Sequence, residues 1–444
     1  MRSPAHRFLA RPLLWFCPWA LSAVLLLSPN AGLRSLGQPG RAAPTPPLAL
    51  VDVTLIDEAG PKPLPHSTIL IEGEKIAAVF PTGSHTLPDS VTTLNLAGRF
   101  VIPGLIDTHV HVASDPSGED ARPRTERRLA IALQGGVTTV RDMAGDARAL
   151  ASLARDARLG AITAPDIYYA ALFAGPAFFK DPRTVATAQG AVAGQVPWMR
   201  AITDTTDLRQ VVAEARGAGA TGIKLYAALD SALARRITAE AHRQELRVWS
   251  HAALDPATPL DVVEAGVDVV SHAALLRFAM NRDLVRGVLQ ALQAGREPDL
   301  ASPGLDTVFA AMVRHHTLFE PTLFVEGDDP SHLAFSAAVA RRAHEAGVTL
   351  IAGTDTLAGV DDSMPNLHAE LELLVARAGL TPQEALRAAT RDAAAAIGIL
   401  ETRGSVEVGK LADLMVLRAD PLRDIRNTRQ VELVLKRGKV YRRS

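Results

Sequence analysis

The chain has 444 residues, of which 48% are hydrophobic, and its 47 basic residues nearly balance 48 acidic ones. This apolar content can bury a large core, which excludes a disordered protein, and the length accommodates one barrel-sized domain plus a smaller one. Because no long run of one charge sign follows the N-terminal segment, we expect no nucleic-acid partner.

Residues 1–45 are expected to lie outside the fold. Basic residues between Arg2 and Arg11 precede an apolar stretch from Leu13 to Leu27, an order typical of an export signal. We therefore predict a secreted or periplasmic protein. The only cysteine, Cys17, lies inside this stretch, so no disulfide is expected in the mature protein. Because no clean small-residue cleavage site follows, an uncleaved membrane anchor is the alternative, and only then would the membrane be a partner.

Short strands at both ends of the chain, in residues 46–102 and 402–444, predict a small β-sandwich domain. Both stretches are rich in Val, Ile, Leu and Thr and are divided by Gly, Pro and Asp turn signals. Neither stretch has enough strands to be stable alone, so we expect them to fold together. The predicted strands are Leu48–Leu55, Ser67–Glu72, Lys75–Phe80, Val91–Leu96, Gly404–Glu407, Ala412–Leu417, Gln430–Lys436 and Lys439–Arg442.

Residues 103–401 alternate between strand and helix patterns, which predicts an α/β fold. Regular alternation over this length favours a parallel (β/α)8 TIM barrel, and a doubly wound sheet is the alternative. Leu367–Ala378 and Thr381–Ile397 are predicted as the closing helices, and the long connections 174–206 and 273–316 as candidates for a lid. The predicted strands are Gly104–His111, Thr138–Met143, Asp166–Leu172, Gly222–Tyr226, Arg247–His251, Val267–His272, Thr317–Leu323 and Val348–Gly353.

Ligand-type side chains lie at or near the ends of these predicted strands. In a parallel barrel the carboxyl ends of all strands open on one face, where such folds carry their active sites. A separate core role for each histidine is the alternative, but their matching positions argue for one shared site. The candidate residues are His109, His111, Lys224, His251, His272 and Asp355.

Several motifs in this order resemble the amidohydrolase superfamily, in particular its imidazolonepropionase-like and prolidase-like metal-dependent hydrolases. They are Pro-Gly-Leu-Ile-Asp-Thr-His-Val-His at 103–111, Gly-Ile-Lys-Leu-Tyr at 222–226, Ser-His-Ala at 250–252 and 271–273, and Ala-Gly-Thr-Asp at 352–355. The segment from Leu380 to Leu414 is also similar to that group. The resemblance covers residues 48 to about 440 and is specific for the superfamily rather than for a substrate.

The resemblance implies two divalent metal ions, most simply zinc, which accepts imidazole and carboxylate ligands. His109, His111 and Asp355 would hold one ion, and His251 and His272 the other. In binuclear members, the lysine at the position of Lys224 is carboxylated by CO2 and bridges the metals. The alternative is a lysine that faces a solvent-filled mouth or pairs with an acid.

The implied activity is attack of hydroxide on the C–N amide bond of a small molecule, such as a dipeptide or an N-acyl amino acid, with Asp355 as the proton acceptor. Tyr226, on the same strand face as Lys224, is a candidate substrate contact. The alternatives are hydrolysis of a lactone, an organophosphate ester or a cyclic amide, a single-metal deaminase, and a non-catalytic binding protein.

Other polar residues stay closer to structural roles. Arg141 and Asp142 are as readily explained by an ion pair near the rim, and His368 is a weak candidate for the site. Surface positions are expected for His315, His316, His332 and His344.

Overall fold

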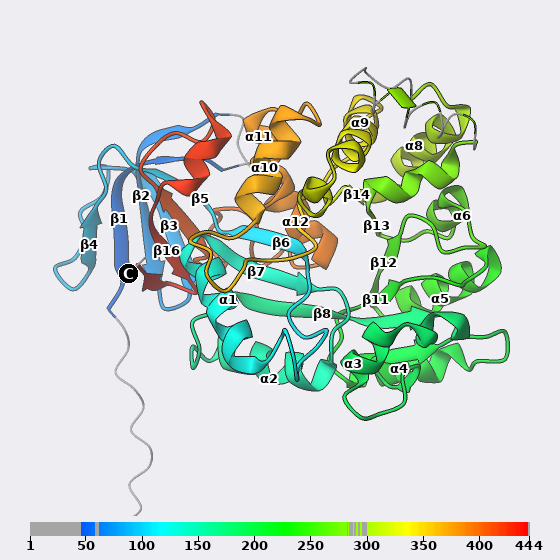
Figure 1. Ribbon diagram of the computed structural model, residues 1–444. Helices are drawn as coiled ribbons and strands as arrows, with labels where there is room; N and C mark the ends of the chain where they lie inside the picture. Colours follow the sequence, from blue (N-terminus) through cyan, green and yellow to red (C-terminus); the bar gives the residue numbers. More distant parts are fainter. Residues whose placement is uncertain are drawn as a thin grey trace, which may run out of the picture. The chain divides into compact units, whose positions relative to one another are not determined.

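The computed structural model describes residues 46–57, 62–281 and 300–442, together with residues 283, 287, 290, 291 and 294 (Figure 1). The predicted export signal at residues 1–45 and part of the connection 273–316 lie outside the described residues. None of the described helices is both long and apolar enough to cross a membrane.

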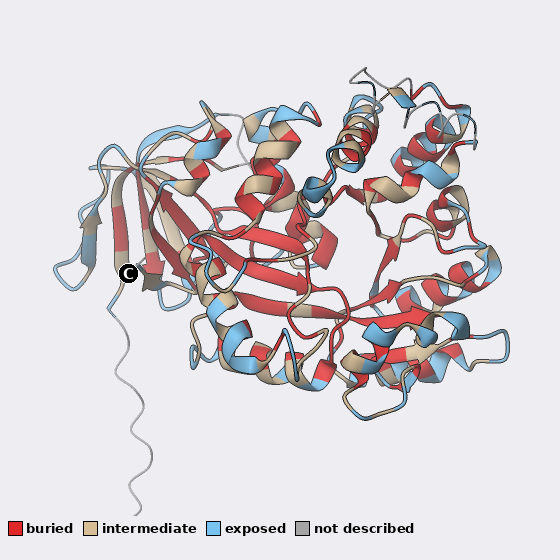
Figure 2. Cartoon of the chain, viewed as in Figure 1, coloured by how far each residue is buried: buried red, intermediate tan, exposed pale blue. Residues whose placement is uncertain are grey.

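The middle of the chain forms the predicted parallel barrel. Seven strands pair side by side in chain order, every neighbouring pair being parallel. Figure 2 shows these strands buried, whereas the surrounding helices expose one face to solvent. The barrel strands are β6 (Leu105–Val110), β7 (Val137–Asp142), β8 (Asp166–Ala174), β11 (Gly222–Leu225), β12 (Arg247–His251), β13 (Val269–Ser271) and β14 (Leu318–Glu320).

The eighth barrel position, predicted at Val348–Gly353, is an extended segment rather than a continuous strand. Isolated parallel bridges join Leu350 to Phe319 of β14 and Thr356 to Val110 of β6, which closes the barrel. The backbone of Ala352 accepts a hydrogen bond from Thr108 of β6, but its amide donates to Ala388. Because the segment divides its hydrogen bonds among several elements, no regular ladder forms.

The helices that follow the barrel strands bury one face, and α2, α4, α5, α6, α9 and α11 begin at a side-chain N-cap. In α2, Asp146 caps the N-terminus and Leu150 and Leu153 face the core. The helices are α1 (Arg122–Gln134), α2 (Ala147–Arg158), α4 (Leu208–Gly217), α5 (Ser231–Arg243), α6 (Pro259–Glu264), α8 (Pro303–His315), α9 (Pro330–Glu345), α10 (Leu367–Ala376), α11 (Pro382–Ala388) and α12 (Arg391–Ile397).

The single helix predicted at Thr381–Ile397 is wrong, since the structure divides it into α11 and α12. The expected start is confirmed: Thr381 and Glu384 form a capping box. The break at Ala389 and Thr390 has a clear cause. The carbonyl of Ala389 accepts a hydrogen bond from Ile106 of β6, and that of Ala388 accepts one from Ala352, so the barrel takes hydrogen bonds that a continuous helix would use.

The strands of the two chain ends pair in one eight-stranded sheet with a separate buried core. Strand β5 connects the strands of the two chain ends, because it pairs with β1 on one side and with β15 on the other. The two ends therefore fold together. The strands are β1 (Leu48–Leu55), β2 (Leu64–Glu72), β3 (Lys75–Pro81), β4 (Thr92–Asn95), β5 (Phe100–Pro103), β15 (Leu414–Leu417), β16 (Val431–Lys436) and β17 (Lys439–Tyr441).

Two strand assignments at the chain ends need correction. The sequence pattern misses β5, because the strand is short and ends at a proline next to Gly104. The strand predicted at Gly404–Glu407 is wrong. Gly404 has a φ of 90°, outside the extended region, and Glu407 begins a turn whose carbonyl accepts the amide of Lys410.

The two long connections contain structure of their own. The first holds η1 (Pro176–Lys180), α3 (Pro182–Ala188), β9 (Gln195–Val196) and β10 (Met199–Ala201), and β10 pairs with the carboxyl end of β8. In the second, η2 (Ala273–Ala279) follows β13 and precedes α8. Outside both connections, η3 (Phe324–Asp328) follows β14. The remaining short helix, η4 (Ile425–Arg429), lies before β16.

Candidate metal centre and active site

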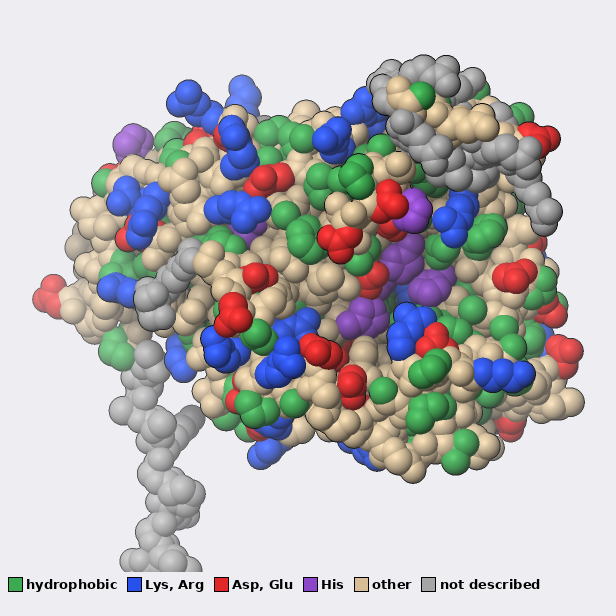
Figure 3. Space-filling view, in the orientation of Figure 1, with side chains coloured by type: hydrophobic (Ala, Val, Ile, Leu, Met, Phe, Trp, Pro, Cys, Tyr) green, Lys and Arg blue, Asp and Glu red, His purple; other side chains and the backbone are tan. Residues whose placement is uncertain are grey.

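The candidate ligands meet at the carboxyl end of the barrel. His109 lies in β6, His251 ends β12, and His272 directly follows β13. Figure 3 shows histidine side chains gathered in one place on the face turned to the reader, with acidic and basic side chains around them. Residues separated by more than 200 positions in the sequence thus form one cluster, as the strand-end pattern predicts.

The first group comprises His109, His111 and Asp355, which offer ligand atoms that all lie within 4.8 Å of one another. Asp355 Oδ1 lies 3.2 Å from His109 Nε2 and 3.0 Å from His111 Nε2. Imidazole nitrogen and carboxylate oxygen are the ligands that zinc and other transition metals take in proteins. The donor set therefore fits one metal ion.

The second group, His251 and His272, is adjacent to the first. The ring centroids of His251 and His272 are 4.9 Å apart, and those of His272 and His109 are also 4.9 Å apart. His272 Nδ1 lies 3.9 Å from Asp355 Oδ2. The structure thus brings all the predicted histidines and Asp355 into one contiguous cluster.

Every histidine of the cluster hydrogen-bonds through Nδ1 to the protein. His109 Nδ1 donates to Glu320 Oε2 at 2.6 Å, and His251 Nδ1 donates to the carbonyl of Tyr226 at 2.9 Å. The other partners are the hydroxyls of Ser114 for His111 and of Thr322 for His272, at 3.3 and 3.0 Å. The Nδ1 contacts hold each ring as in metal-binding histidines whose other nitrogen is the ligand, and the Nε2 atoms of His109 and His111 face Asp355.

Burial keeps most of the cluster in the protonation state that metal binding requires. It lowers the pKa of His109 and His251, and that of His272 to about 3, so these rings are neutral at neutral pH. Burial opposes ionisation of Asp355, but His109 and His111 hold its pKa below the usual value. His111 differs: burial disfavours its charged form, yet Asp355 raises its pKa. Where His111 is protonated, binding of a metal ion to its Nε2 would release that proton.

Two of the candidate ligands have an unusual backbone conformation. His272 has a φ of 73° and Asp355 a φ of 58°, in the left-handed region that residues other than glycine rarely adopt. Such backbone strain concentrates at functional sites, where the surrounding structure holds it in place. At Asp355 the support comes from Asp107, which accepts hydrogen bonds from the amide and hydroxyl of Thr354.

Lys224 is fully buried at the base of the cluster. Its Nζ donates to Ser271 Oγ at 3.0 Å, and among the described residues no carboxylate lies within ion-pair distance. The buried Lys436 offers a contrast, because its Nζ lies 2.9 Å from Asp166 Oδ1. Burial lowers the pKa of Lys224 to about 7, partly opposed by the charge of Glu320. Lys224 thus neither faces a solvent-filled mouth nor pairs with a described acid.

Glu320, at the end of β14, belongs to the site although sequence reasoning missed it. It is fully buried and accepts hydrogen bonds from His109, from Ser271 at 2.7 Å, from Arg141 at 2.8 Å and from Thr108. Burial opposes its ionisation, but Arg141 and His109 hold its pKa below the usual value. The available sequence signal was an acid inside the apolar run Thr317–Leu323.

Gly353, in the motif that carries Asp355, is required by close packing. A Cβ at this position would lie 2.8 Å from both Glu320 Oε1 and His109 Cβ. Only a residue without a side chain lets the eighth segment approach this closely. The glycine of the Gly-Thr-Asp motif therefore brings Asp355 to the histidines.

Tyr226 connects the cluster to the first long connection. Its ring centroid lies 4.5 Å from that of His251 and 5.2 Å from that of Phe178 in η1. The Tyr226 hydroxyl donates to the carbonyl of Met143 at 2.8 Å. Tyr226 and Phe178 thus give the cluster an aromatic wall.

The remaining polar candidates have structural roles. The predicted Arg141–Asp142 pair is wrong: Arg141 pairs with Glu320, and Asp142 accepts the amides of Val112 and Gly145. His368 is buried away from the cluster, between Thr428 and the carbonyl of Gly135. Of the four histidines expected at the surface, His315, His316 and His332 are exposed, and His344 is half-buried.

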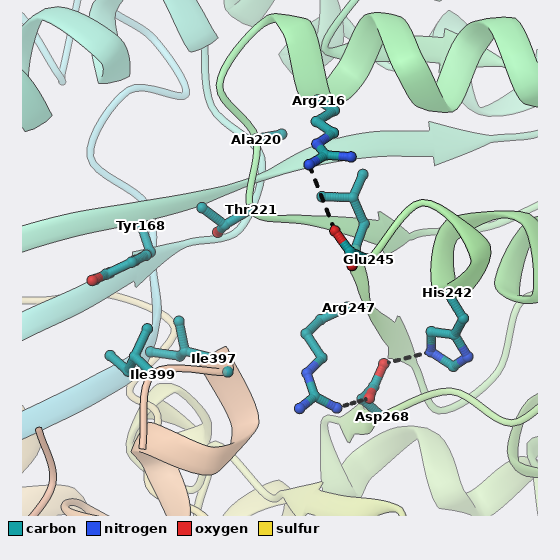
Figure 4. Close-up of a pocket in the computed structure, with 12 residues that line it drawn as sticks. Tyr168, Arg216, Ala220, Thr221, His242, Glu245, Arg247, Asp268, Ile397 and Ile399 are labelled. Carbon is teal, nitrogen blue, oxygen red and sulfur yellow. Dashed lines mark hydrogen bonds and ion pairs between the residues drawn. The ribbon is translucent and has the colours of Figure 1, made fainter. Parts of the chain in front are cut away.

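A separate cavity of about 700 Å³ opens at the amino end of the barrel strands (Figure 4). Its charged side chains pair with one another: Arg216 with Glu245, and Asp268 with both Arg247 and His242. This end of a parallel barrel serves stability rather than chemistry in known enzymes. The histidine cluster at the carboxyl end is therefore the candidate active site.

A closed parallel barrel with histidines and an aspartate at its carboxyl end defines a metal-dependent hydrolase of the barrel class. Residues 100–441 match the Amidohydrolase family, and the chain belongs to that family. The resemblance read from the motifs is thus confirmed.

Among curated relatives, ochratoxinase from Aspergillus niger is 28% identical over 388 residues, which cover 77% of this chain and 75% of the relative. A crystal structure of a prolidase complexed with N-methylphosphonate-L-proline is similar with a TM-score of 0.69 and 25% identity, over 90% of this chain and 100% of that one. A Xaa-Pro dipeptidase with bound methionine shares the fold, with a TM-score of 0.70 and 21% identity over 89% and 100% of the two chains.

Proposed function

We propose that this amidohydrolase hydrolyses the amide bond of small N-acyl amino acids or dipeptides, with two divalent metal ions, most simply zinc, and a carbamate on Lys224. The observation that carries the proposal is the cluster itself: four histidines that are each held through Nδ1, an ionised Asp355, and a buried lysine without a described acidic partner. When bound, the metal ions supply a nucleophilic water at neutral pH and polarise the substrate carbonyl.

Asp355 is the residue that moves the proton. Its carboxylate is ionised at neutral pH and lies at the centre of the histidine cluster. It accepts a proton from the attacking water and passes it to the nitrogen that leaves when the C–N bond breaks. The buried site around it excludes most bulk water, which strengthens these electrostatic interactions.

The walls of the site support a substrate with an apolar side chain and a carboxylate. Tyr226 and Phe178 form the aromatic wall next to His251. The guanidinium of Arg183 on α3 donates hydrogen bonds to Asp181, which raise its pKa, and the charge of Asp355 acts in the same direction. A C-terminal amino acid released from a dipeptide or an N-acyl compound has both groups. Ochratoxinase and the prolidase that this chain resembles are, by name, consistent with this class.

A single-metal hydrolase, such as a deaminase, is the second candidate. It is favoured by the observation that only His109, His111 and Asp355, among the described residues, bring ligand atoms together within 4.8 Å. A single-metal enzyme would not need a modified Lys224. Counting metal ions per chain separates the two candidates.

Export is also a proposal, and it rests on the order of basic and apolar residues between Arg2 and Leu27. It places the enzyme in the periplasm or outside the cell.

The zinc-loaded protein is expected to hydrolyse N-acyl amino acids or dipeptides whose C-terminal residue is apolar. The test is a screen against libraries of both classes, alongside lactones, cyclic amides and phosphotriesters, with release of the free amino acid as the readout. The same protein stripped by a chelator is the control. Turnover confined to lactones or phosphotriesters would contradict the proposed substrate class.

A further inference from the structure

We infer that Glu320 is a positioning residue that holds the ligands of both proposed metal ions in place. The inference rests on the proposed metal centre. It concerns a residue at the end of the seventh barrel strand, outside the set of ligands. Four hydrogen bonds from described residues meet at its carboxylate.

One oxygen of Glu320 is shared by two elements of the site. Oε2 accepts the Nδ1–H of His109 at 2.6 Å and the hydroxyl of Ser271 at 2.7 Å. Ser271 in turn accepts the Nζ–H of Lys224 at 3.0 Å. A single carboxylate oxygen therefore orients a ligand of the first ion and, through Ser271, the lysine proposed to bridge the two.

The backbone of Glu320 contacts a proposed ligand of the second ion. Its carbonyl accepts the amide of His272 at 2.9 Å, next to the strained φ of that histidine. The other carboxylate oxygen, Oε1, accepts Arg141 Nη2 at 2.8 Å, so the buried negative charge is paired. Both residues are fully buried, which means that water cannot replace a lost partner.

Among the described residues, four donors meet at the Glu320 carboxylate, and two of them, His109 Nδ1–H and Arg141, cannot accept a hydrogen bond. One end of the glutamine amide is an NH2 group, which donates only. Placed at Oε2 it would oppose His109, which would lose the partner that fixes its Nε2 toward Asp355. Placed at Oε1 it would oppose Arg141, and in either placement Arg141 loses its charged partner although the side-chain volume is unchanged.

Glu370 on α10 offers the matched control. It is also fully buried, but among the described residues its oxygens accept only backbone amides, those of Leu323 at 3.1 Å and Phe324 at 2.7 Å. Glu370→Gln replaces the same atoms without touching a proposed ligand. Burial raises the pKa of Glu370 to about 8, so this control reports the loss of a buried acceptor rather than the loss of a charge.

The test is the zinc dissociation constant of the full chain, measured by competition with a chelator. Glu320→Gln is expected to weaken zinc binding about 10- to 100-fold, the usual cost of losing an outer partner of a metal ligand, and Glu370→Gln by a few-fold at most. If Glu320→Gln does not fold, Glu320→Asp keeps the charge opposite Arg141 and is expected to weaken binding to an intermediate degree.

The outcomes separate the inference from the proposed function. Unchanged zinc affinity in a folded Glu320 variant, or equal losses in the Glu320→Gln and Glu370→Gln proteins, would overturn the positioning role and leave the metal centre standing. A wild-type chain that binds no zinc would instead contradict the proposed function.

Discussion

Asp355→Asn is expected to lower the rate of amide hydrolysis by roughly 10²-fold or more while most of the metal is retained. Asparagine has nearly the same size and offers an oxygen ligand, but its amide cannot accept the proton of the attacking water. The structure places this carboxylate within 3.2 Å of the Nε2 atoms of His109 and His111 and keeps it ionised. The measurement pairs kcat with elemental analysis of the same sample.

The matched control for this prediction is Asp268→Asn. Asp268 is also held by several donors, including Arg247 and His242, but lies at the opposite end of the barrel. Its substitution is expected to change stability rather than the rate per folded molecule. If the Asp355→Asn protein turns over at nearly the wild-type rate, Asp355 is a metal ligand and not the proton acceptor.

Lys224→Ala is expected to abolish most of the activity. The loss should exceed the roughly 10- to 100-fold that removing an outer partner of a metal ligand costs. The substitution removes the amine that we propose reacts with CO2 to form a carbamate, a reaction that releases one proton and leaves an anion. Burial lowers the pKa of Lys224 to about 7, so neutral amine is available at neutral pH. A short carboxylic acid such as acetate or propionate, filling the space as a substitute anion, is expected to restore part of the activity.

Lys436→Ala is the control for that rescue. Lys436 is buried as well, but it is paired with Asp166 and donates to the carbonyls of Ala157 and Ala164. Its loss is expected to destabilise the protein, and added carboxylate is expected to have no effect. If Lys224→Ala keeps full activity and metal content, Lys224 is a structural residue and the bridge does not exist.

The barrel and the clustering of the candidate ligands at its carboxyl end can be predicted from the sequence, because each is a repeated local signal. Buried parallel strands are short apolar runs, and His251, His272 and the His109–His111 pair each follow or end one of them. The topology then brings the strand ends to one face without further information. The eighth segment fits this rule only partly, because its hydrogen bonds are divided between β6, β14 and the end of α11.

The sequence could not identify the support of the site, since that support depends on contacts far apart in the chain. Glu320 lies 211 positions from His109, and a glutamate in an apolar run does not reveal whether it faces a histidine or solvent. Arg141 looked like the partner of its neighbour Asp142, but adjacent residues on a strand point to opposite faces, and the barrel interior pairs it with Glu320.

The proposed two-metal centre is tested most directly by counting metal ions per chain in a fully active preparation. Elemental analysis of the zinc-loaded wild-type protein, with the same sample assayed for hydrolysis of N-acyl amino acids, is predicted to give about two ions per chain, because the proposed ligand set provides for two. Activity should then disappear on chelation and return as the second equivalent of zinc is added. Full activity with one ion per chain, or with none, would contradict the two-metal centre.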